Sequence, residues 1–248
     1  MNEDLEEKLK YLRLMGLHAN WDNYMKLIQK KNLSHINFLK HIINEEYNIK
    51  KENARKMRMV RAKMPEQFEI ETFPFSKQAK LNKKKILALY DSFDYMLKHQ
   101  NIILIGPTGT GKTGLATSFL TQAINKGHTG RFIPFPELVE ILYKSVADHS
   151  EGKIIKNLAT YDCLLLDELG YVEVDPMQVG MFFTLMSKRH KKKTTLITSN
   201  LGFGEWASFL KNDQLTAALI DRLTENSHVI NMKKCVSLRP RLCQITDK

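Results

Sequence analysis

The 248-residue sequence lacks the features that mark secreted, membrane-spanning and zinc-binding proteins. Its three cysteines, Cys163, Cys235 and Cys243, are too widely spaced to match a zinc-ligand pattern. No apolar run approaches the roughly 18 residues of a membrane span, and the acidic, polar start Met1–Glu7 does not resemble a secretory signal. Internal repeats and low-complexity segments are also absent. We therefore expect a globular cytoplasmic protein that makes no contact with a membrane.

Acidic side chains are too few to balance the basic ones. The sequence has 38 Lys and Arg residues against 27 Asp and Glu residues, which leaves a formal net charge of +11. A surplus of this kind either keeps a protein soluble or attracts a polyanion. The basic residues gather in clusters, which favours contact with a nucleic-acid backbone. These clusters are Lys83–Lys85, Lys188–Lys193, and the set Lys50, Lys51, Arg55, Lys56, Arg58, Arg61 and Lys63 on one predicted helix.

A phosphate-binding loop is the most informative motif present. The apolar run Ile102–Ile105 predicts a short buried strand, and it leads into the spacing Gly106-x-x-x-x-Gly111-Lys112-Thr113. Glycines let backbone N–H groups turn toward phosphate oxygens where a Cβ would clash. Lys112 can reach the β- and γ-phosphates, and a helix expected to begin there directs its positive end at the anion. We expect a nucleoside triphosphate to bind through Gly106, Pro107, Thr108, Gly109, Thr110, Gly111, Lys112 and Thr113.

Two neighbouring carboxylates follow the apolar run Cys163–Leu166, which predicts a second core strand. Asp167, at the carboxyl end of this strand, can hold Mg²⁺ through its water shell, together with the Thr113 hydroxyl. The adjacent Glu168 can polarise a water molecule for in-line attack on the γ-phosphate. Because both groups follow a phosphate-binding loop, they predict hydrolysis of ATP with Mg²⁺ as cofactor.

Two further side chains are candidates for the same reaction. Asn200 follows the predicted strand Thr194–Thr198, so it is expected beside the γ-phosphate, where it can orient the attacking water. Its alternative role is to form a turn. Arg222 lies on a predicted helix and can enter the site of a neighbouring subunit to stabilise transition-state charge. The alternative is a surface arginine paired with Asp221 or Glu225, and spacing alone does not decide between the two.

The N-terminal part of the chain predicts a small all-helical domain. Leucine and aromatic residues recur there at helical spacing, and we expect Gly16 to separate two short helices. Ser34 is placed to cap a longer helix, which Pro65 should end. We expect residues 1–64 to form this domain and to serve DNA binding and oligomerisation.

The remainder of the chain predicts an α/β ATPase domain. An extended linker, residues 65–77, is expected to dock through its phenylalanines and to lead into residues 78–248. One helix is expected to carry the apolar residues of Ile86–Leu97. A strand at Gly130–Pro134 and a helix around Gln178–Arg189 continue an alternation of strands with helices. This alternation indicates a parallel sheet covered on both faces.

Together these motifs resemble the IstB-like ATPases, the transposition-helper branch of the AAA+ group that also contains the DnaC helicase loaders. The phosphate-loop motifs occur in many ATPases, whereas Asp-Glu-Leu-Gly-Tyr and Asn-Leu-x-Phe-x-Glu-Trp are more specific. The resemblance spans nearly the whole chain. It rests on Leu12–Leu17, Gly106–Thr113, Leu164–Tyr171, Thr198–Trp206, Ala218–Leu223 and the terminal Ser237-Leu-Arg239.

The resemblance implies a P-loop AAA+ three-layer core behind the helical domain. It also implies an ATP-dependent homo-oligomer that assembles on double-stranded DNA, recruits and stimulates a partner transposase, and loosens on hydrolysis. Arg222 would then be a trans-acting arginine finger, and Arg239 a nucleotide- or DNA-facing residue. Gly114 and Leu238 depart from the family pattern, where bulkier and aromatic residues are frequent. Both departures concern fine positioning rather than a phosphate or metal contact.

Other classes of ATP- or GTP-binding protein fit the sequence less well. A helicase loader of the DnaC type is the main alternative, because it would keep the same ATP site and differ in its partner. A GTPase is disfavoured because no Asn-Lys-x-Asp base-reading motif occurs. A small-molecule kinase would require an arginine-rich lid, and no such segment interrupts the core.

Overall fold

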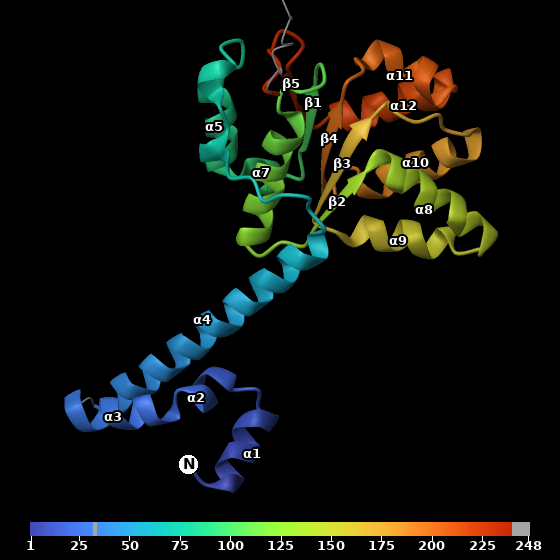
Figure 1. Ribbon diagram of the computed structural model, residues 1–248. Helices are drawn as coiled ribbons and strands as arrows, with labels where there is room; N and C mark the ends of the chain where they lie inside the picture. The colour runs from blue at the N-terminus through green and yellow to red at the C-terminus, as the bar shows by residue number, and fades with distance from the viewer. Residues whose placement is uncertain (32–33, 240–248) are drawn as a thin grey trace, which may run out of the picture. The chain divides into compact units, whose positions relative to one another are not determined.

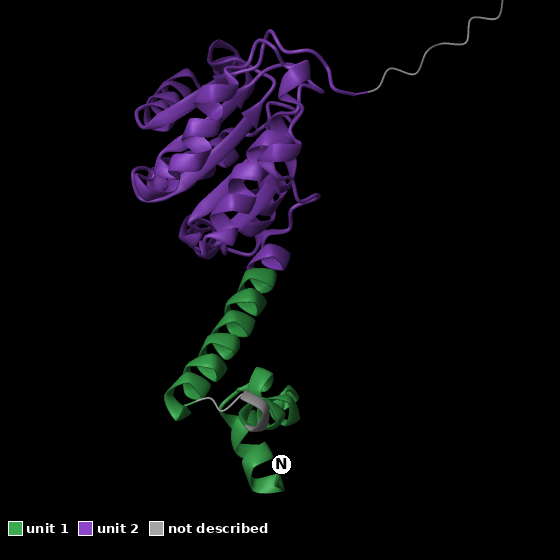
Figure 2. Cartoon of the chain, turned by 90° about the vertical axis from the view of Figure 1, so that its left-hand side faces the viewer, with its two compact units in different colours: residues 1–57 green, residues 58–248 purple. Residues whose placement is uncertain are grey.

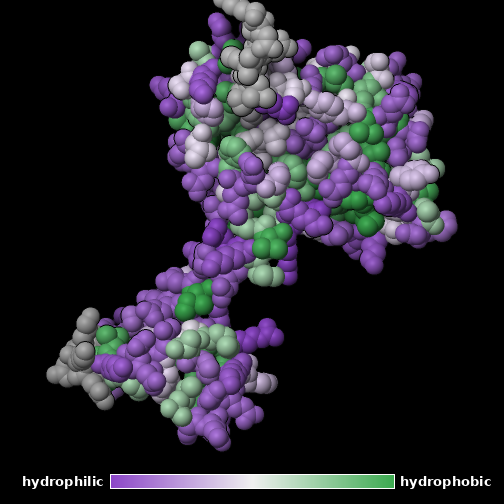
Figure 3. Space-filling model, in the orientation of Figure 1, coloured by the Kyte–Doolittle hydropathy of each residue, from purple (hydrophilic) through white to green (hydrophobic). Residues whose placement is uncertain are grey.

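The computed structural model describes residues 1–31 and 34–239, with backbone only at 29–31, and Cys243 lies outside them. The chain forms two compact units, unit 1 (residues 1–57) and unit 2 (residues 58–248) (Figure 2). In the view of Figure 3, hydrophilic residues dominate the surface of both units, and hydrophobic residues form separate small patches. No helix in the described ranges is both long and apolar enough to cross a membrane.

Unit 1 is helical, as the apolar spacing predicts. Asn2 caps the first helix through its side-chain oxygen, which accepts a hydrogen bond from the Leu5 N–H at 3.0 Å. Ser34 occupies the predicted capping position, where its hydroxyl accepts from the Asn37 N–H at 3.3 Å. The helices are α1 (Glu3–Tyr11), α2 (Met15–Ala19), α3 (Trp21–Lys31) and α4 (His35–Ala62), the last of which continues into unit 2.

Gly16 does not separate two helices, so that prediction is wrong. It lies buried inside α2, and a Cβ there would come within 2.4 Å of the Ile49 side chain and 2.7 Å of Glu46. The chain instead breaks at Arg13, which has a left-handed φ of 55°. Gly16 therefore serves the close approach of α2 to α4, a packing requirement that local sequence does not reveal.

The segment between α4 and the ATPase core packs against the core. Helix α4 ends at Ala62, ahead of Pro65, and Lys63 adopts a left-handed φ of 53°. Instead of running extended, the chain then forms 3-10 turns at Ile70–Thr72 and Phe75–Lys77. The ring of Phe73 is buried between them. The segment thereby becomes part of one wall of unit 2.

A five-stranded parallel sheet forms the centre of unit 2, in the order β2-β3-β4-β1-β5. The predicted strands are confirmed, although β3 runs on through the two carboxylates to Leu169. The fifth strand was not anticipated, because its sequence Ser-His-Val-Ile-Asn is short and largely polar. The strands are β1 (Asn101–Ile105), β2 (Gly130–Pro134), β3 (Cys163–Leu169), β4 (Thr194–Ser199) and β5 (Ser227–Asn231).

Helices cover both faces of this sheet, which gives three layers (Figure 1). Alternate side chains of β1 point to opposite faces: Ile102 and Leu104 join one hydrophobic cluster, whereas Ile103 and Ile105 join the other. The first cluster contains α7 (Lys112–Asn125) and the buried residues of α5 (Lys83–Ser92) and α6 (Asp94–Leu97). The second contains α8 (Phe135–Ala147), α9 (Glu151–Thr160), α10 (Pro176–Arg189), α11 (Phe203–Leu210) and α12 (Asp213–Thr224).

The single helix expected through Leu97 is in fact two helices. The chain breaks at Phe93, which adopts a left-handed φ of 59°. The Phe93 ring packs edge-on against Tyr95 at 5.4 Å, and both rings are buried. Burial of these aromatic rings holds a conformation that the helical spacing alone does not indicate.

Candidate active site

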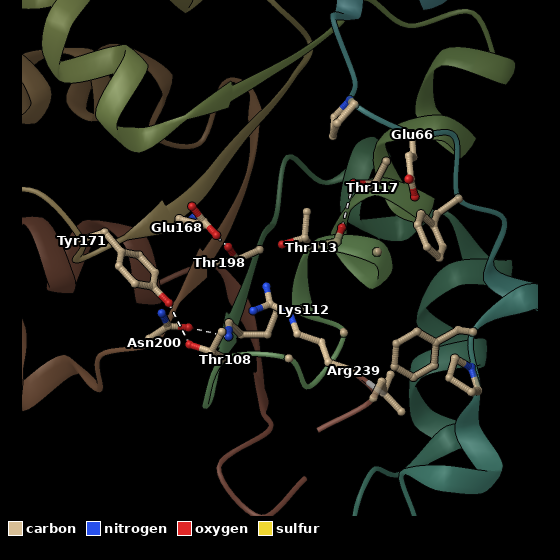
Figure 4. A pocket seen from close by; sticks show the side chains of 18 residues that line it. Glu66, Thr108, Lys112, Thr113, Thr117, Glu168, Tyr171, Thr198, Asn200 and Arg239 are labelled. Carbon is tan, nitrogen blue, oxygen red and sulfur yellow. Dashed lines mark hydrogen bonds between the residues drawn. The ribbon is translucent and has the colours of Figure 1, made fainter. Parts of the chain in front are cut away.

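A cavity of about 860 Å³ lies at the carboxyl ends of β1, β3 and β4, within unit 2 (Figure 4). In a parallel sheet these ends meet at one edge, where the order of strands reverses direction and a crevice forms. The cavity is bordered on one side by residues of the segment after α4 and by residues 236–239, here called the C-terminal tail. Its lining includes Thr108, Gly109, Gly111, Lys112, Thr113, Glu168, Asn200 and Arg239, all of which were predicted as site residues.

The phosphate-binding loop curves over the start of α7. Gly109 and Gly111 have left-handed φ values of 81° and 94°, which residues with a Cβ rarely adopt. Gly111 is the N-cap of α7 and offers no side chain to the helix end, so the loop leaves backbone N–H groups available to an anion. Thr110 braces the loop from beneath, because its hydroxyl donates to the Pro107 carbonyl at 2.9 Å.

Lys112 is held at the mouth of this loop. Its Nζ donates to the carbonyl oxygens of Gly106 at 2.7 Å and Pro107 at 2.9 Å, and to Asn200 Oδ1 at 2.6 Å. Burial lowers the pKa of Lys112, and the nearby charges of Asp167 and Glu168 oppose that shift. The structure thus brings Lys112 and Asn200 together although 88 positions separate them in sequence.

The Asp167 carboxylate accepts hydrogen bonds from the hydroxyl groups of Thr113 and Thr198. Thr113 Oγ1 donates to both carboxylate oxygens, at 3.0 and 3.1 Å, and Thr198 Oγ1 donates to Oδ1 at 2.5 Å. Burial raises the pKa of Asp167, while the hydrogen bonds from Thr198 and Thr113 counteract that rise. A hydroxyl beside a carboxylate suits Mg²⁺, which proteins commonly bind through one or two oxygen ligands together with substrate phosphates. The donor set therefore fits the expected cofactor.

Glu168 reaches into the cavity from a local irregularity in the sheet. The register of β3 against β4 shifts between Leu166 and Leu169, and Glu168 takes a left-handed φ of 61°. Its N–H donates to Thr198 Oγ1 at 2.9 Å, which fixes this conformation. The bulge sends two consecutive side chains to the same site, with Asp167 buried beside Thr113 and the Glu168 carboxylate exposed in the cavity.

The two predicted arginines lie in different places. Arg239 lines the cavity and projects toward Lys112 in Figure 4. Arg222 is not among the lining residues. Its guanidinium carbon stacks 4.4 Å from the centroid of the Phe183 ring, and its Nη1 is buried without a hydrogen-bond partner among the described residues. Glu225 pairs with His190 and Lys191, so within the described ranges no ion pair joins it to Arg222.

Several lining residues were missed by the sequence analysis. Thr198 contacts both carboxylate residues of β3, and Tyr171 shares a 2.8 Å hydrogen bond with Thr108 of the loop. A hydroxyl near the end of the strand before Asn200 was the available signal for Thr198. The segment after α4 supplies an aromatic and proline-rich wall, which its composition could have indicated. These wall residues are Pro65, Phe68, Phe73 and Pro74.

Comparison with known proteins finds relatives that are named as ATP-binding proteins. The model of the IstB-like ATP binding protein family matches residues 7–242. The insertion sequence IS21 ATP-binding protein of Pseudomonas aeruginosa is 29% identical, over 93% of this chain and 86% of that protein. The insertion sequence IS232 ATP-binding protein of Bacillus thuringiensis is 27% identical, over 93% of this chain and 92% of that protein.

Solved structures show the same fold at lower sequence identity. The crystal structure of DnaI matches with a TM-score of 0.56 and 18% identity, over 66% of this chain and 90% of that one. The DnaC helicase loader matches with a TM-score of 0.51 and 22% identity, over 60% of this chain and 87% of that one. The fold, the site and the family match together assign the sequence: the chain belongs to the IstB-like ATP-binding protein family and is an ATPase with the AAA+ fold.

Proposed function

We propose that this ATPase is a regulator that assembles on double-stranded DNA in its ATP-bound form, recruits a transposase, and disassembles when it hydrolyses ATP. The observation that carries the proposal is that two carboxylates lie at one phosphate-binding loop: Asp167 is buried and hydrogen-bonded to Thr113, whereas Glu168 is exposed. The names of the relatives, which are ATP-binding proteins of insertion sequences, support a transposition context.

The site residues divide the hydrolysis reaction between them. Lys112 and the N-terminal end of α7 neutralise charge on the β- and γ-phosphates. Thr113 and Asp167 would hold Mg²⁺, which supplies further charge neutralisation when it is bound. Glu168 accepts the proton of the attacking water, and Asn200, which already touches Lys112, orients that water. These roles agree with the burial of the two carboxylates. The exposed Glu168 can reach a water molecule, as a general base must, and the buried Asp167 is held in one position, as suits a metal ligand.

Arg222 does not line the cavity of its own chain, and we propose that it acts in the site of a neighbouring copy. Stacking on Phe183 holds the guanidinium, and its buried Nη1 has no hydrogen-bond partner among the described residues, so a movement of the side chain would offer an unsatisfied donor to a group from another copy. A phosphate in the site of a neighbouring copy is such a group. Nucleotide at that shared boundary would hold neighbouring copies together, and hydrolysis would remove one of the charges that Arg222 contacts.

The basic residues of α4 support DNA as the surface on which the assembly forms. Lys50, Lys51 and Lys56 are exposed, and they lie within two turns of the helix. Partly compensating acid is present, since Glu52 pairs with Arg55. Exposed lysines on a helix contact phosphates without reading the base sequence.

The proposal is tested by separating nucleotide binding from hydrolysis. Lys112→Ala should abolish nucleotide binding, whereas Glu168→Gln should still bind ATP, stop turnover and remain on DNA after a chase with unlabelled duplex. Glu168→Gln that retains fast turnover would exclude Glu168 as the base. Pull-downs of this trapped form that offer a transposase and a replicative helicase side by side decide between the proposed partner and the helicase-loader alternative.

A further inference from the structure

A single buried glutamine ties the C-terminal tail to the phosphate-binding loop. Gln78 is 1% exposed, and its amide nitrogen donates to the Thr110 carbonyl at 3.0 Å and the Val236 carbonyl at 2.8 Å. Its amide oxygen accepts from the Val236 N–H at 3.0 Å. The side chain thus uses three of its hydrogen-bonding positions to join segments 32 and 158 positions away in sequence.

Beyond this anchor the tail lies directly on the loop. The Leu238 N–H donates to the Gly109 carbonyl at 2.8 Å. A Cβ at Gly109 would come within 2.5 Å of the Ser237 hydroxyl, and one at Gly111 within 3.0 Å of the Leu238 side chain. The loop glycines therefore admit the tail on one side, in addition to the phosphates on the other.

Arg239 follows at once and enters the cavity. It borders the same space as Lys112, toward which it projects in Figure 4. Arg239 is exposed, and an exposed arginine side chain has many conformations available, so holding it at one site costs conformational entropy. The tail reduces this cost, because its backbone is fixed at Val236 and again at Leu238.

We propose that Gln78 is a positioning residue for Arg239: it fixes the tail against the loop so that Arg239 contacts the phosphates of the bound nucleotide in its own subunit. The inference rests on the nucleotide site described under the proposed function. It assigns the tail a task within one chain, whereas Arg222 acts between chains. Loss of the Gln78 amide leaves the Val236 N–H and the Thr110 carbonyl without their partner, so the tail detaches and Arg239 with it.

The test is a double-mutant cycle on nucleotide affinity. Binding of a fluorescent ATP analogue is measured for the full chain and for Gln78→Ala, Arg239→Ala and the double variant. Each single change should raise Kd about tenfold, as expected for loss of one charge-assisted contact, and the double variant should be no weaker than the single ones. Independent effects would multiply to about a hundredfold, and that result would overturn the inference, as would a Gln78→Ala variant with unchanged affinity.

A matched control separates positioning from stability. Gln122 is another buried glutamine of unit 2, whose amide nitrogen donates to the Tyr90 carbonyl at 2.8 Å, and it does not line the cavity. Gln122→Ala should lower the melting temperature but leave Kd unchanged; a rise in its Kd equal to that of Gln78→Ala would reduce Gln78 to a structural role. If Gln78→Ala does not fold, Gln78→Met keeps the length of the side chain. Wild-type protein that fails to assemble on DNA would defeat the proposed function and leave this cycle intact.

Discussion

Replacing Thr198 by valine tests how the two carboxylates are held in place. Thr198 is fully buried, and its hydroxyl donates to Asp167 at 2.5 Å while it accepts from the Glu168 N–H at 2.9 Å. Valine has nearly the same shape, so the change removes both hydrogen bonds and leaves the packing intact. One lost bond is to a charged group and the other leaves a backbone N–H unpaired, so the free energy of unfolding should fall by about 2–4 kcal/mol.

The same substitution should alter catalysis in a defined direction. The Thr198 hydroxyl holds the pKa of Asp167 down against the effect of burial, so its loss raises that pKa further. Because Asp167 must be ionised to hold Mg²⁺, the acid limb of the ATPase pH profile should move to higher pH and half-saturation should require more Mg²⁺. The maximal rate should fall about tenfold or more as Glu168 loses its fixed conformation.

The experiment combines denaturant unfolding with steady-state ATP hydrolysis. Thr194→Val is the matched control, since Thr194 is equally buried on the same strand and its hydroxyl donates to the Tyr95 carbonyl at 2.8 Å, away from the cavity. It should cost about 1 kcal/mol and leave the pH profile unchanged. A Thr198→Val enzyme with wild-type Mg²⁺ dependence and an unshifted acid limb would refute the reasoning.

Three further outcomes are expected. Asp167→Asn should abolish hydrolysis yet unfold at a higher denaturant concentration than wild type at neutral pH, because the raised pKa of Asp167 means that its ionised form lowers the stability of the folded state. This gain in stability should shrink as pH falls through the folded pKa toward 3.8. A gain that stays constant with pH would contradict the assigned cause. Arg222→Ala should bind nucleotide normally but hydrolyse it slowly, and mixing it with Lys112→Ala protein should restore some turnover if the arginine acts between copies. Lys50, Lys51 and Lys56 are exposed, and replacing all three by glutamine should reduce the slope of log affinity for DNA against log salt concentration by up to about three. Binding titrations at several salt concentrations measure this slope. An unchanged slope would mean that DNA binds to another part of the protein.

The sequence predicted the centre of the ATPase fold because its signals there are local. An apolar run followed by a glycine-rich loop, or by Asp167 and Glu168, predicts a strand, the point where the strand ends and the function of the residues after it, all from about a dozen consecutive residues. β5 escaped prediction because it lies at the edge of the sheet, where among the described residues it pairs with β1 alone, and such a strand needs few apolar residues. Gly16 was misjudged because its close neighbours Glu46 and Ile49 are distant in sequence. Phe93 was misjudged because its ring packs against Tyr95 and His128 in the folded core.

The site shows the same division between local and distant information. Lys112 and Thr113 follow from a motif, whereas Gln78 and Thr198 act through partners 30 or more positions away. No spacing rule connects such residues before the fold is known. The role of Arg222 could not be decided from spacing. The alternative was an ion pair with Glu225, and only the fold shows that Glu225 pairs with His190 and Lys191 instead.

Electron microscopy of the full chain on duplex DNA, with ATP and with ADP, tests the central claim most directly. If nucleotide at a boundary between copies holds the assembly together, ATP should give ordered rings or spirals on the DNA and ADP should give dispersed particles. Particles that are the same size with both nucleotides, and that remain so for Glu168→Gln, would contradict the account.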